Sequence, residues 1–348
     1  MVAEYYKLLD RFTELCGRLV DQGQPYLTII LCHELFRFTY PFEPYAKFIN
    51  DTNPVAFITG HIRKLVEVGE GFRNAVTPYT FMVQEYESHW RDNTLATATA
   101  NLYSDLWKAF DTETLTNESL DLLKQRLPET IIEQEVKGAS ILDMGCGSGR
   151  YSIALARLGA KEVVGVDIQE QSFATAKQWC REKNLPVEFK EANFHQLPFD
   201  DESFDFVFSN GVLMHSGSIE KGLAELSRVL RSSHKAFLYV YAIGGIFWTT
   251  RQVLRQVFTR IPLAYTRMVL QSIGLPSNRF IFCDTWYVPL EVHTATEDLH
   301  RMLDEAGFTY EKVVSRVSSD LDRAVAGNIP GAKEMWGEGD HRYILEKL

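Results

Sequence analysis

The residues from Asp143 to Gly149 combine the types and spacing needed to hold a nucleotide-like ligand. They follow a short apolar run and place glycine at positions 145, 147 and 149. Alternate glycines permit positive φ angles and let a ligand lie against bare backbone, while the first amides of a following helix point toward it. Asp167 ends the next apolar run, where a carboxylate can accept hydrogen bonds from the hydroxyls of a ribose. We therefore expect a ribose-bearing ligand at two neighbouring strand ends of one sheet.

Short apolar runs alternate with helix-like stretches after residue 138, which is typical of a parallel sheet wrapped by helices. The expected strands are 140–144, 162–168, 187–192, 204–210, 236–241, 310–315 and 341–345. The predicted fold class is α/β, with a Rossmann-like, doubly wound, mostly parallel seven-stranded sheet. Thr294 and Glu297 also fit a capping box for a helix that carries Leu299 and Leu303 inward.

The chain from about residue 101 to the C-terminus resembles the class I S-adenosylmethionine-dependent methyltransferases, with a type 11 or type 25 core. The first family motif, an acidic residue followed by GxGxG, is matched by Asp143 and the three glycines. The stretches 197–200, 204–207 and 223–230 continue the family pattern. The resemblance implies S-adenosylmethionine as the cofactor. It also implies methyl transfer by in-line displacement to an oxygen or nitrogen nucleophile of a small molecule.

The same resemblance implies which residues contact the cofactor. They are Asp143, Gly145, Gly147, Gly149, Asp167, Ile168, Asn193, Phe194, Asn210, Tyr103 and Trp107. Asn193 and Phe194 would meet the adenine, although Asp is more frequent in the family at the first of these positions. Tyr103 and Trp107 share one helical face, which is also typical of an ordinary core stripe. In relatives such a helix covers the methionine end of the cofactor.

His215 follows the fourth expected strand, at the edge where a methyl acceptor would lie. A histidine has a pKa near neutrality and can take a proton from a hydroxyl or amine, so we predict that His215 is the catalytic base. Many relatives carry two histidines here, whereas this chain has Met214 before His215, and a helix residue bonded to backbone is the alternative. We expect no metal site, because His195 and Asn193 lack a third ligand.

Residues 244–283 interrupt the alternation with a stretch that contains arginine but neither Asp nor Glu. We interpret it as a basic helical insertion. Our main interpretation is that the insertion is a lid over the substrate. A surface for an anionic substrate, a helix at a membrane interface and a plain solvated helix pair are the alternatives.

The rest of the chain favours helices and suggests three parts. No strand pattern of useful length precedes residue 138, and apolar residues recur at helical spacing from Tyr5 to Leu19. Further helices are expected near 26–38, 61–68 and 101–110. The predicted parts are an all-helical accessory or substrate domain over 1–100, helices covering the cofactor site over 101–137, and the methyltransferase domain over 138–348.

Composition narrows the expected partners and location. The 36 basic and 46 acidic side chains give a net charge of −10, which disfavours broad nucleic-acid binding. Five cysteines without a CxxC pair favour a reducing cytoplasm. We see no signal peptide, and the most apolar window is too short to cross a bilayer, which disfavours membrane contact. We expect a soluble cytoplasmic protein with a small-molecule substrate, whose helical domain encloses the substrate or forms a homodimer contact.

Three other functions stay open at this point. The chain could bind the cofactor as a regulatory subunit without turnover, or methylate a peptide or protein. A nicotinamide-dependent oxidoreductase fits less well, because its fingerprint is GxGxxG and Arg150 follows Gly149 here.

Overall fold

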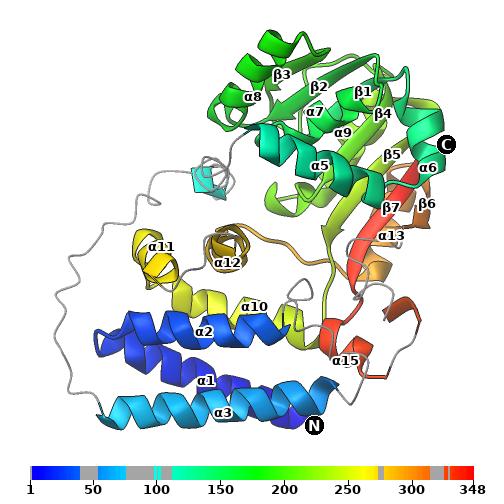
Figure 1. Cartoon of the computed structure of the whole chain (residues 1–348). Coiled ribbons are helices and arrows are strands. Elements are labelled where there is room, and N and C mark those ends of the chain that lie inside the picture. Colours follow the sequence, from blue (N-terminus) through cyan, green and yellow to red (C-terminus); the bar gives the residue numbers. More distant parts are fainter. Residues whose placement is uncertain are drawn as a thin grey trace. The chain divides into compact units, whose positions relative to one another are not determined.

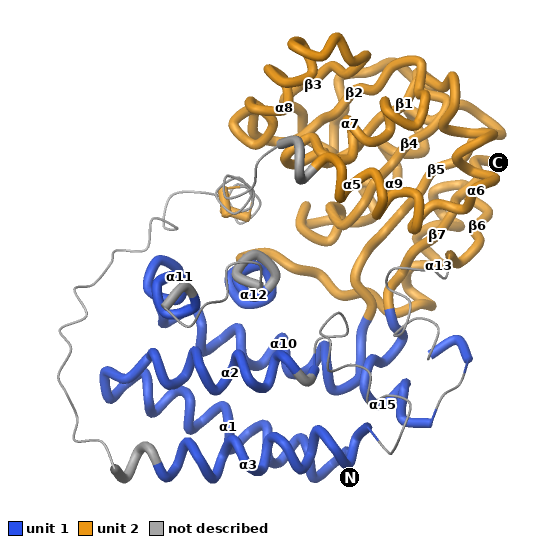
Figure 2. The backbone as a smooth tube through the Cα atoms, in the orientation of Figure 1, with its two compact units in different colours: residues 1–91, 243–288, 323–339 blue, residues 92–242, 289–322, 340–348 orange. Residues whose placement is uncertain are grey.

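The computed structural model describes residues 2–39, 54–75, 98–99, 101–102, 112–272, 278–313, 325–327 and 330–348. The chain divides into two compact units, which Figure 2 distinguishes by colour. A helical unit combines residues 1–91, 243–288 and 323–339, and a sheet unit combines residues 92–242, 289–322 and 340–348.

The sheet unit is built on a seven-stranded sheet with the order β3-β2-β1-β4-β5-β7-β6 (Figure 1). Its parallel strands are β1 (Ser140–Met144), β2 (Glu162–Asp167), β3 (Val187–Glu191), β4 (Phe204–Asn210) and β5 (Leu230–Tyr241). The remaining pair is β6 (Phe308–Lys312) and β7 (Asp340–Lys347), with β7 antiparallel to both of its neighbours. This mostly parallel, Rossmann-like sheet confirms the predicted fold class.

Helices connect the strands of this sheet. They are α5 (Thr112–Arg126), α6 (Glu129–Ile131), the π-helix η2 (Ile132–Val136), α7 (Arg150–Arg157), α8 (Glu170–Lys183), the 3-10 turn η3 (Leu213–His215), α9 (Ile219–Val229) and α13 (Thr296–Glu305). The predicted capping box is wrong, because Ala295 precedes α13 and no side chain caps the helix. Thr294 instead ties the segment to the sheet: its N–H donates to the Tyr241 carbonyl at 3.1 Å, and its carbonyl accepts from His341 Nε2 at 2.8 Å.

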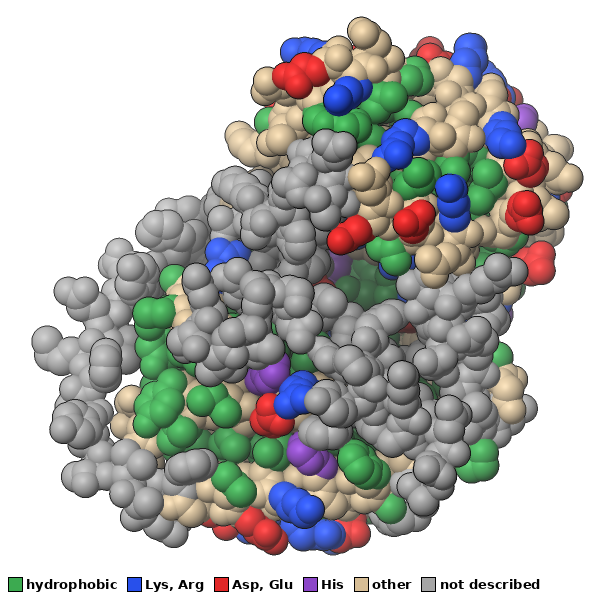
Figure 3. Space-filling view, viewed as in Figure 1, with side chains coloured by type: hydrophobic (Ala, Val, Ile, Leu, Met, Phe, Trp, Pro, Cys, Tyr) green, Lys and Arg blue, Asp and Glu red, His purple; other side chains and the backbone are tan. Residues whose placement is uncertain are grey.

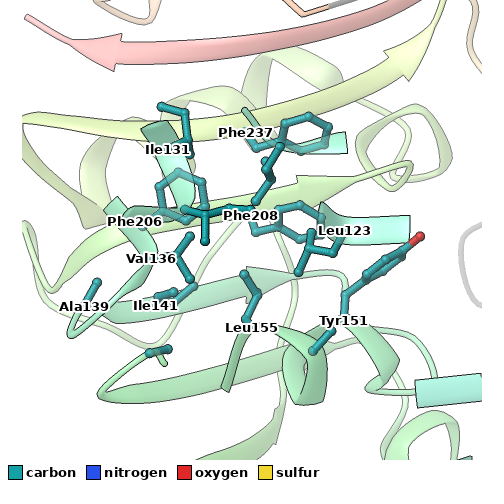
Figure 4. Close-up of a cluster of buried hydrophobic side chains, with 14 of the residues drawn as sticks. Leu123, Ile131, Val136, Ala139, Ile141, Tyr151, Leu155, Phe206, Phe208 and Phe237 are labelled. Carbon is teal, nitrogen blue, oxygen red and sulfur yellow. The ribbon is translucent and has the colours of Figure 1, made fainter. Parts of the chain in front are cut away.

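One apolar core lies between the sheet and α5, η2 and α7 (Figure 4). Phe208 and Phe237 are register partners on β4 and β5, and their rings stack at 5.1 Å between centroids. Leu123 from α5 joins this layer. Tyr151 lies at one end of the cluster with its hydroxyl pointing away from it (Figure 4). The core therefore fixes α5 and the first turn of α7 against the ends of the central strands.

The helical unit brings together helices from distant parts of the sequence. They are α1 (Val2–Asp21), α2 (Pro25–Thr39), α3 (Pro54–Ala75), α10 (Gly245–Phe258), α11 (Leu263–Ser272), α12 (Asn278–Tyr287) and α15 (Ala332–Trp336). Tyr5 of α1 is hydrogen-bonded to Thr250 of α10, with 2.7 Å between their hydroxyl oxygens. Phe258 stacks on Trp286 at 5.3 Å between ring centroids. The basic insertion expected over 244–283 thus packs with the N-terminal helices.

Three arginines of that insertion are buried or paired within the helical unit. Arg251 is only 4% exposed, Arg260 forms an ion pair with Asp21, and Arg255 donates to the Val288 carbonyl. Exposed apolar residues on the unit include Phe57 and Met268, and the space-filling view shows hydrophobic side chains interspersed with charged ones (Figure 3). Among the described helices, none has the length and apolar character needed to cross a membrane. A plain solvated helix pair is therefore not what this insertion forms.

Candidate cofactor site

The turn after β1 adopts a backbone that requires glycine. Gly145 has φ 86°, and a Cβ there would lie 2.3 Å from the side chain of Val212. The Gly145 and Cys146 N–H groups donate to the Val166 carbonyl at 2.8 and 2.9 Å, which ties the turn to β2. Gly147 follows with φ 51° and is partly exposed. The turn is thus a fixed stretch of backbone whose middle is open to a ligand.

Gly149 plays a different part in the same turn. It is buried, precedes α7 and has φ 78°. A Cβ on it would lie 2.7 Å from the side chains of Ala176 and Phe189. Glycine is therefore needed at this position for close packing of the turn against α8 and β3, as well as for its backbone conformation.

Asp167 lies within hydrogen-bonding distance of the glycine turn. Its Oδ2 accepts from the Gly147 N–H at 2.9 Å, and its Oδ1 accepts from the Ile168 N–H at 2.8 Å. Burial raises the pKa of Asp167 to about 6, although these backbone N–H groups act against the rise. The structure brings together three residues that the sequence predicted as cofactor contacts.

Asp143 places a second carboxyl group beside this turn. It is 2% exposed, and its Oδ2 accepts from Ser152 Oγ at 2.6 Å. Burial raises the pKa of Asp143 to about 7, and the nearby negative charge of Asp167 adds to the rise. A bound cation would stabilise the ionised forms of these two carboxyl groups, whose pKa values burial raises.

Asn193 and Phe194 follow β3, whose last residue Glu191 is the register partner of Asp167. Asn193 is exposed, and its Oδ1 accepts from the His195 N–H at 2.9 Å. Phe194 is 7% exposed, so most of its ring is already packed in the protein. Both residues lie at the strand end next to Asp167, on the side where the adenine was expected.

Asn210, the last residue of β4, turns its amide toward α5. Its Oδ1 accepts from Arg126 Nη1 at 2.9 Å, and the same nitrogen donates to the Tyr151 hydroxyl at 2.8 Å. Arg126 and Tyr151 were not predicted as site residues. Only the position of Tyr151 directly after the glycine motif could have indicated it from the sequence. Tyr103 and Trp107 lie outside the described residues.

His215 is held by the segment that precedes α13. It is 8% exposed, and its Nδ1 lies 2.6 Å from the Leu290 carbonyl oxygen. Because a carbonyl only accepts, Nδ1 carries the hydrogen, and in the neutral ring Nε2 is the basic nitrogen. The ring packs edge-to-face on Tyr241, at 5.7 Å between centroids, beside the end of β5. His215 is thus bonded to backbone through Nδ1, and its part as a catalytic base stays a prediction.

A buried histidine and glutamate flank the same strand end and were missed by the sequence reasoning. His293 Nδ1 lies 2.8 Å from the Ala242 carbonyl oxygen, and His293 Nε2 lies 2.5 Å from Glu291 Oε1. Their side chains are 6% and 1% exposed. Both ring nitrogens are engaged, so this pair anchors the segment before α13 to the end of β5. Nothing in the spacing of these two residues distinguished them from ordinary loop residues.

Among the residues that the structure describes, no group of three His, Cys, Asp or Glu side chains could hold a metal ion. The candidate site therefore consists of the glycine turn, two carboxyl groups and a basic, aromatic edge that reaches from Arg126 to His215.

Comparison with known proteins gives one family for the part of the chain that contains this site. Residues 142–238 match the model of a family described as a methyltransferase domain. The chain is 29% identical over 194 residues to the tRNA U34 carboxymethyltransferase of Marinobacter nauticus, covering 54% of this chain and 50% of that protein. It is 30% identical over 122 residues to the ubiquinone biosynthesis O-methyltransferase of Pelagibacter ubique, covering 32% and 50%.

A third relative is covered over more of its length. The chain is 28% identical over 210 residues to the sarcosine/dimethylglycine N-methyltransferase of Halorhodospira halochloris, covering 55% of this chain and 71% of that protein. The chain spans about half the length of the first two of these curated relatives. The residues that match the family model all lie in the sheet unit.

Proposed function

Since residues 142–238 belong to the class I S-adenosylmethionine-dependent methyltransferases, whose cofactor is S-adenosylmethionine, we propose that this chain methylates a small molecule. The methyl group would pass to an oxygen or nitrogen nucleophile by in-line displacement. The observation that carries the proposal is the contact of Asp167 with the glycine turn at Gly147, at 2.9 Å.

The residues of the site fit this cofactor chemically. S-adenosylmethionine has a ribose, a sulfonium, an ammonium and a carboxylate group, so its net charge is positive. Asp167 would accept from the ribose hydroxyls, and the partly exposed backbone of Gly147 would lie against the ligand. Asp143 lies on β1 just before the turn, and its ionised form would favour a cation there. Asn193 and Phe194 are proposed to border the adenine.

The protein's task in the reaction is to position the acceptor and to handle its proton. The sulfonium of the bound cofactor supplies an already activated methyl group. The chain must therefore hold a nucleophile in line with that group and exclude water. We propose that His215 accepts the proton that the acceptor loses. Its Nδ1 is held by the Leu290 carbonyl, so Nε2 is the basic nitrogen.

The acceptor is proposed to be a small molecule on chemical grounds. Two relatives are named for ubiquinone biosynthesis and for sarcosine or dimethylglycine, and thus for an oxygen and a nitrogen acceptor. Another relative is named for tRNA, but the net charge of −10 of this chain disfavours a polyanionic partner. The helical unit is proposed to bind the acceptor or to join two copies of the chain, and the protein is proposed to work in the cytoplasm.

A single experiment tests the proposal in two steps. Calorimetry first measures binding of S-adenosylmethionine and S-adenosylhomocysteine to the purified full chain. The protein is then incubated with methyl-labelled cofactor and with three fractions of a cell extract: dialysable metabolites, total RNA and total protein. An Asp167→Asn variant serves as the control for label transfer by contaminants.

Each outcome has a defined meaning. Label in the dialysable fraction supports the proposal. Label in RNA or protein replaces the small-molecule acceptor with that macromolecule. Cofactor binding without product in any fraction favours the regulatory subunit, and absence of cofactor binding by folded protein overturns the proposed function.

A further inference from the structure

Two arginines, Arg126 and Arg150, lie against the Tyr151 ring at the carboxyl edge of the sheet unit. Arg126 Nη1 donates to the Tyr151 hydroxyl, and the Arg150 guanidinium carbon lies 4.5 Å from the ring centre. Burial alone would raise the pKa of Tyr151, but Arg126 and Arg150, with a smaller contribution from Arg342, hold it below its usual value. This edge of the protein is therefore electropositive.

Arg126 differs from Arg342 in how its charge is balanced. Arg342 forms an ion pair with Asp340 at 2.7 Å. The hydrogen-bond partners of Arg126 are the Tyr151 hydroxyl and the Asn210 amide oxygen, which are both neutral. Across the described residues, no carboxylate lies within ion-pair distance of Arg126, although its side chain is partly buried. A partly buried guanidinium without a counter-charge is costly, and a ligand anion would remove that cost.

The hydrogen bonds of Arg126 use one of its nitrogens and leave the two that can bind an anion. Nη1 donates both of its hydrogen bonds to Tyr151 and Asn210. Nε and Nη2 make no hydrogen bond with the described residues, and together they form the planar pair of donors that binds a carboxylate through both oxygens. The two neutral partners thus fix the guanidinium and orient its other edge.

The position of Arg126 connects it with the cofactor site. Tyr151 is the second residue of α7, directly after the glycine turn, and Asn210 ends β4. Figure 4 shows the Tyr151 hydroxyl directed away from the apolar core, and Arg126 donates to that hydroxyl. Arg126 therefore lies beyond the end of the core, between the glycine turn and the ends of β4 and β5.

We propose that Arg126, oriented by Tyr151 and Asn210, binds a carboxylate group of a bound ligand. This inference rests on the proposed function. The carboxylate is either that of the methionine half of S-adenosylmethionine or that of an acidic methyl acceptor. The alternative is that Arg126 only ties α5 to the sheet.

The first arm of the test compares S-adenosylmethionine with decarboxylated S-adenosylmethionine, which lacks only the carboxylate. If Arg126 binds that group, the wild type prefers the intact cofactor by ~10- to 100-fold, and Arg126→Gln reduces the preference to about one. The control is Arg157→Gln, on the same unit. It removes an exposed arginine that also donates to an asparagine, Asn117, at 2.7 Å, and it should leave the preference unchanged.

The second arm detects an acceptor carboxylate. Wild type and Arg126→Gln, both saturated with S-adenosylhomocysteine, are titrated with glutarate and with its neutral analogue glutaramide. Binding of glutarate that is lost in Arg126→Gln but kept in Arg157→Gln supports an acidic acceptor. A cofactor preference lost in the first arm supports the cofactor carboxylate.

The inference is overturned if Arg126→Gln alters selectivity in neither arm while the wild type binds the cofactor. Failure of the wild type to bind any cofactor overturns the proposed function and the inference with it. Should Arg126→Gln fail to fold, Tyr151→Phe keeps the ring and removes the hydroxyl that orients the arginine. That variant must lower the same selectivity several-fold, and an unchanged value contradicts the inference.

Discussion

Ser152 Oγ donates a 2.6 Å hydrogen bond to Asp143 Oδ2 and thereby joins the first turn of α7 to the end of β1. This bond stabilises the ionised carboxylate, but burial outweighs it and raises the pKa of Asp143 to about 7. Burial therefore opposes ionisation of the carboxyl group next to the glycine turn. Several measurable properties depend on it.

The first concerns stability and pH. Because the pKa of Asp143 is raised in the folded state, the free energy of unfolding falls as pH increases from about 4 to about 7. Asp143→Asn removes that loss. We expect its Tm to match the wild type near pH 4 and to exceed it at pH 8 by roughly 2 to 6 °C, for about 1 to 2 kcal/mol. Circular dichroism of ligand-free protein measures this difference.

Asp205→Asn is the control for stability, and we expect it to change Tm in the opposite direction. Burial alone would raise the pKa of Asp205, but the Ser140 N–H and Arg231 lower it, so this carboxylate stabilises the fold above its unfolded pKa. Asp205→Asn should therefore lower Tm at pH 8 more than at pH 4. Equal behaviour of the two variants would contradict the assignment of Asp143.

The second prediction concerns cofactor affinity and pH. The pKa values are about 7 for Asp143 and about 6 for Asp167, and a bound cation favours both ionised forms. The affinity for S-adenosylmethionine should therefore rise as pH increases from 5.5 to 7.5, by roughly tenfold. Calorimetry across this range measures it, with Asp143→Asn expected to show a flatter profile. A flat profile for the wild type would separate these carboxyl groups from cofactor binding.

The third prediction concerns Asp167 itself. Asp167→Asn keeps the size of the side chain but removes its charge and one acceptor for the ribose. Affinity for S-adenosylmethionine should fall by about 1 to 3 kcal/mol with an unchanged circular dichroism spectrum. Asp200→Asn, at an exposed position of the same unit, is the matched control and should bind normally. Unchanged affinity in Asp167→Asn would remove Asp167 from the cofactor site.

The fourth prediction separates the structural and chemical parts of His215. In His215→Asn the amide N–H can replace Nδ1 as donor to the Leu290 carbonyl, while the basic Nε2 is lost. Turnover of the labelled acceptor should fall by about 10²- to 10⁴-fold with unchanged cofactor affinity. His195→Asn is the control at a partly exposed histidine of the same unit. Full activity of His215→Asn across the pH range would exclude a catalytic base at this position.

The fifth prediction isolates close packing at Gly149. Gly138 and Gly149 have similar φ values, 73° and 78°, but a Cβ meets nothing within 4 Å at the first and two side chains at 2.7 Å at the second. Alanine should cost about 1 to 2 kcal/mol at Gly138 from backbone strain alone. At Gly149 it should cost a further 1 to 3 kcal/mol from overpacking. Denaturant unfolding compares them, and equal losses would contradict the packing role.

The sheet was predictable because its signals are local. The five parallel strands are short apolar runs with a turn or helix between them, and each lies within a few residues of its expected range, although β5 begins earlier, at Leu230. Asp167 could also be placed, because a residue that ends a neighbouring parallel strand must lie beside the glycine turn. The antiparallel addition of β7 beside β5 completes the predicted sheet.

The remaining features depend on contacts between distant residues. Arg126 ends a helix of ordinary composition, and only the fold brings it to Asn210, 84 positions away. Thr294 had the sequence of a helix cap but is bonded instead to the Tyr241 and His341 positions of the sheet. The helices that pack against α10 could not be predicted either, because amphipathic spacing indicates that a helix face is buried but not which element covers it.

The helical unit draws on three separate stretches of chain, 1–91, 243–288 and 323–339. During synthesis, α1 to α3 leave the ribosome long before α10, α12 and α15 are made. The apolar surfaces of α1 to α3 therefore stay exposed until helices more than 150 positions later in the sequence have been synthesised. Completion of this unit therefore comes late in translation. Truncated nascent chains that stop before residue 243 would expose these surfaces to chaperones, and no cut in the gene can liberate the unit as one continuous fragment.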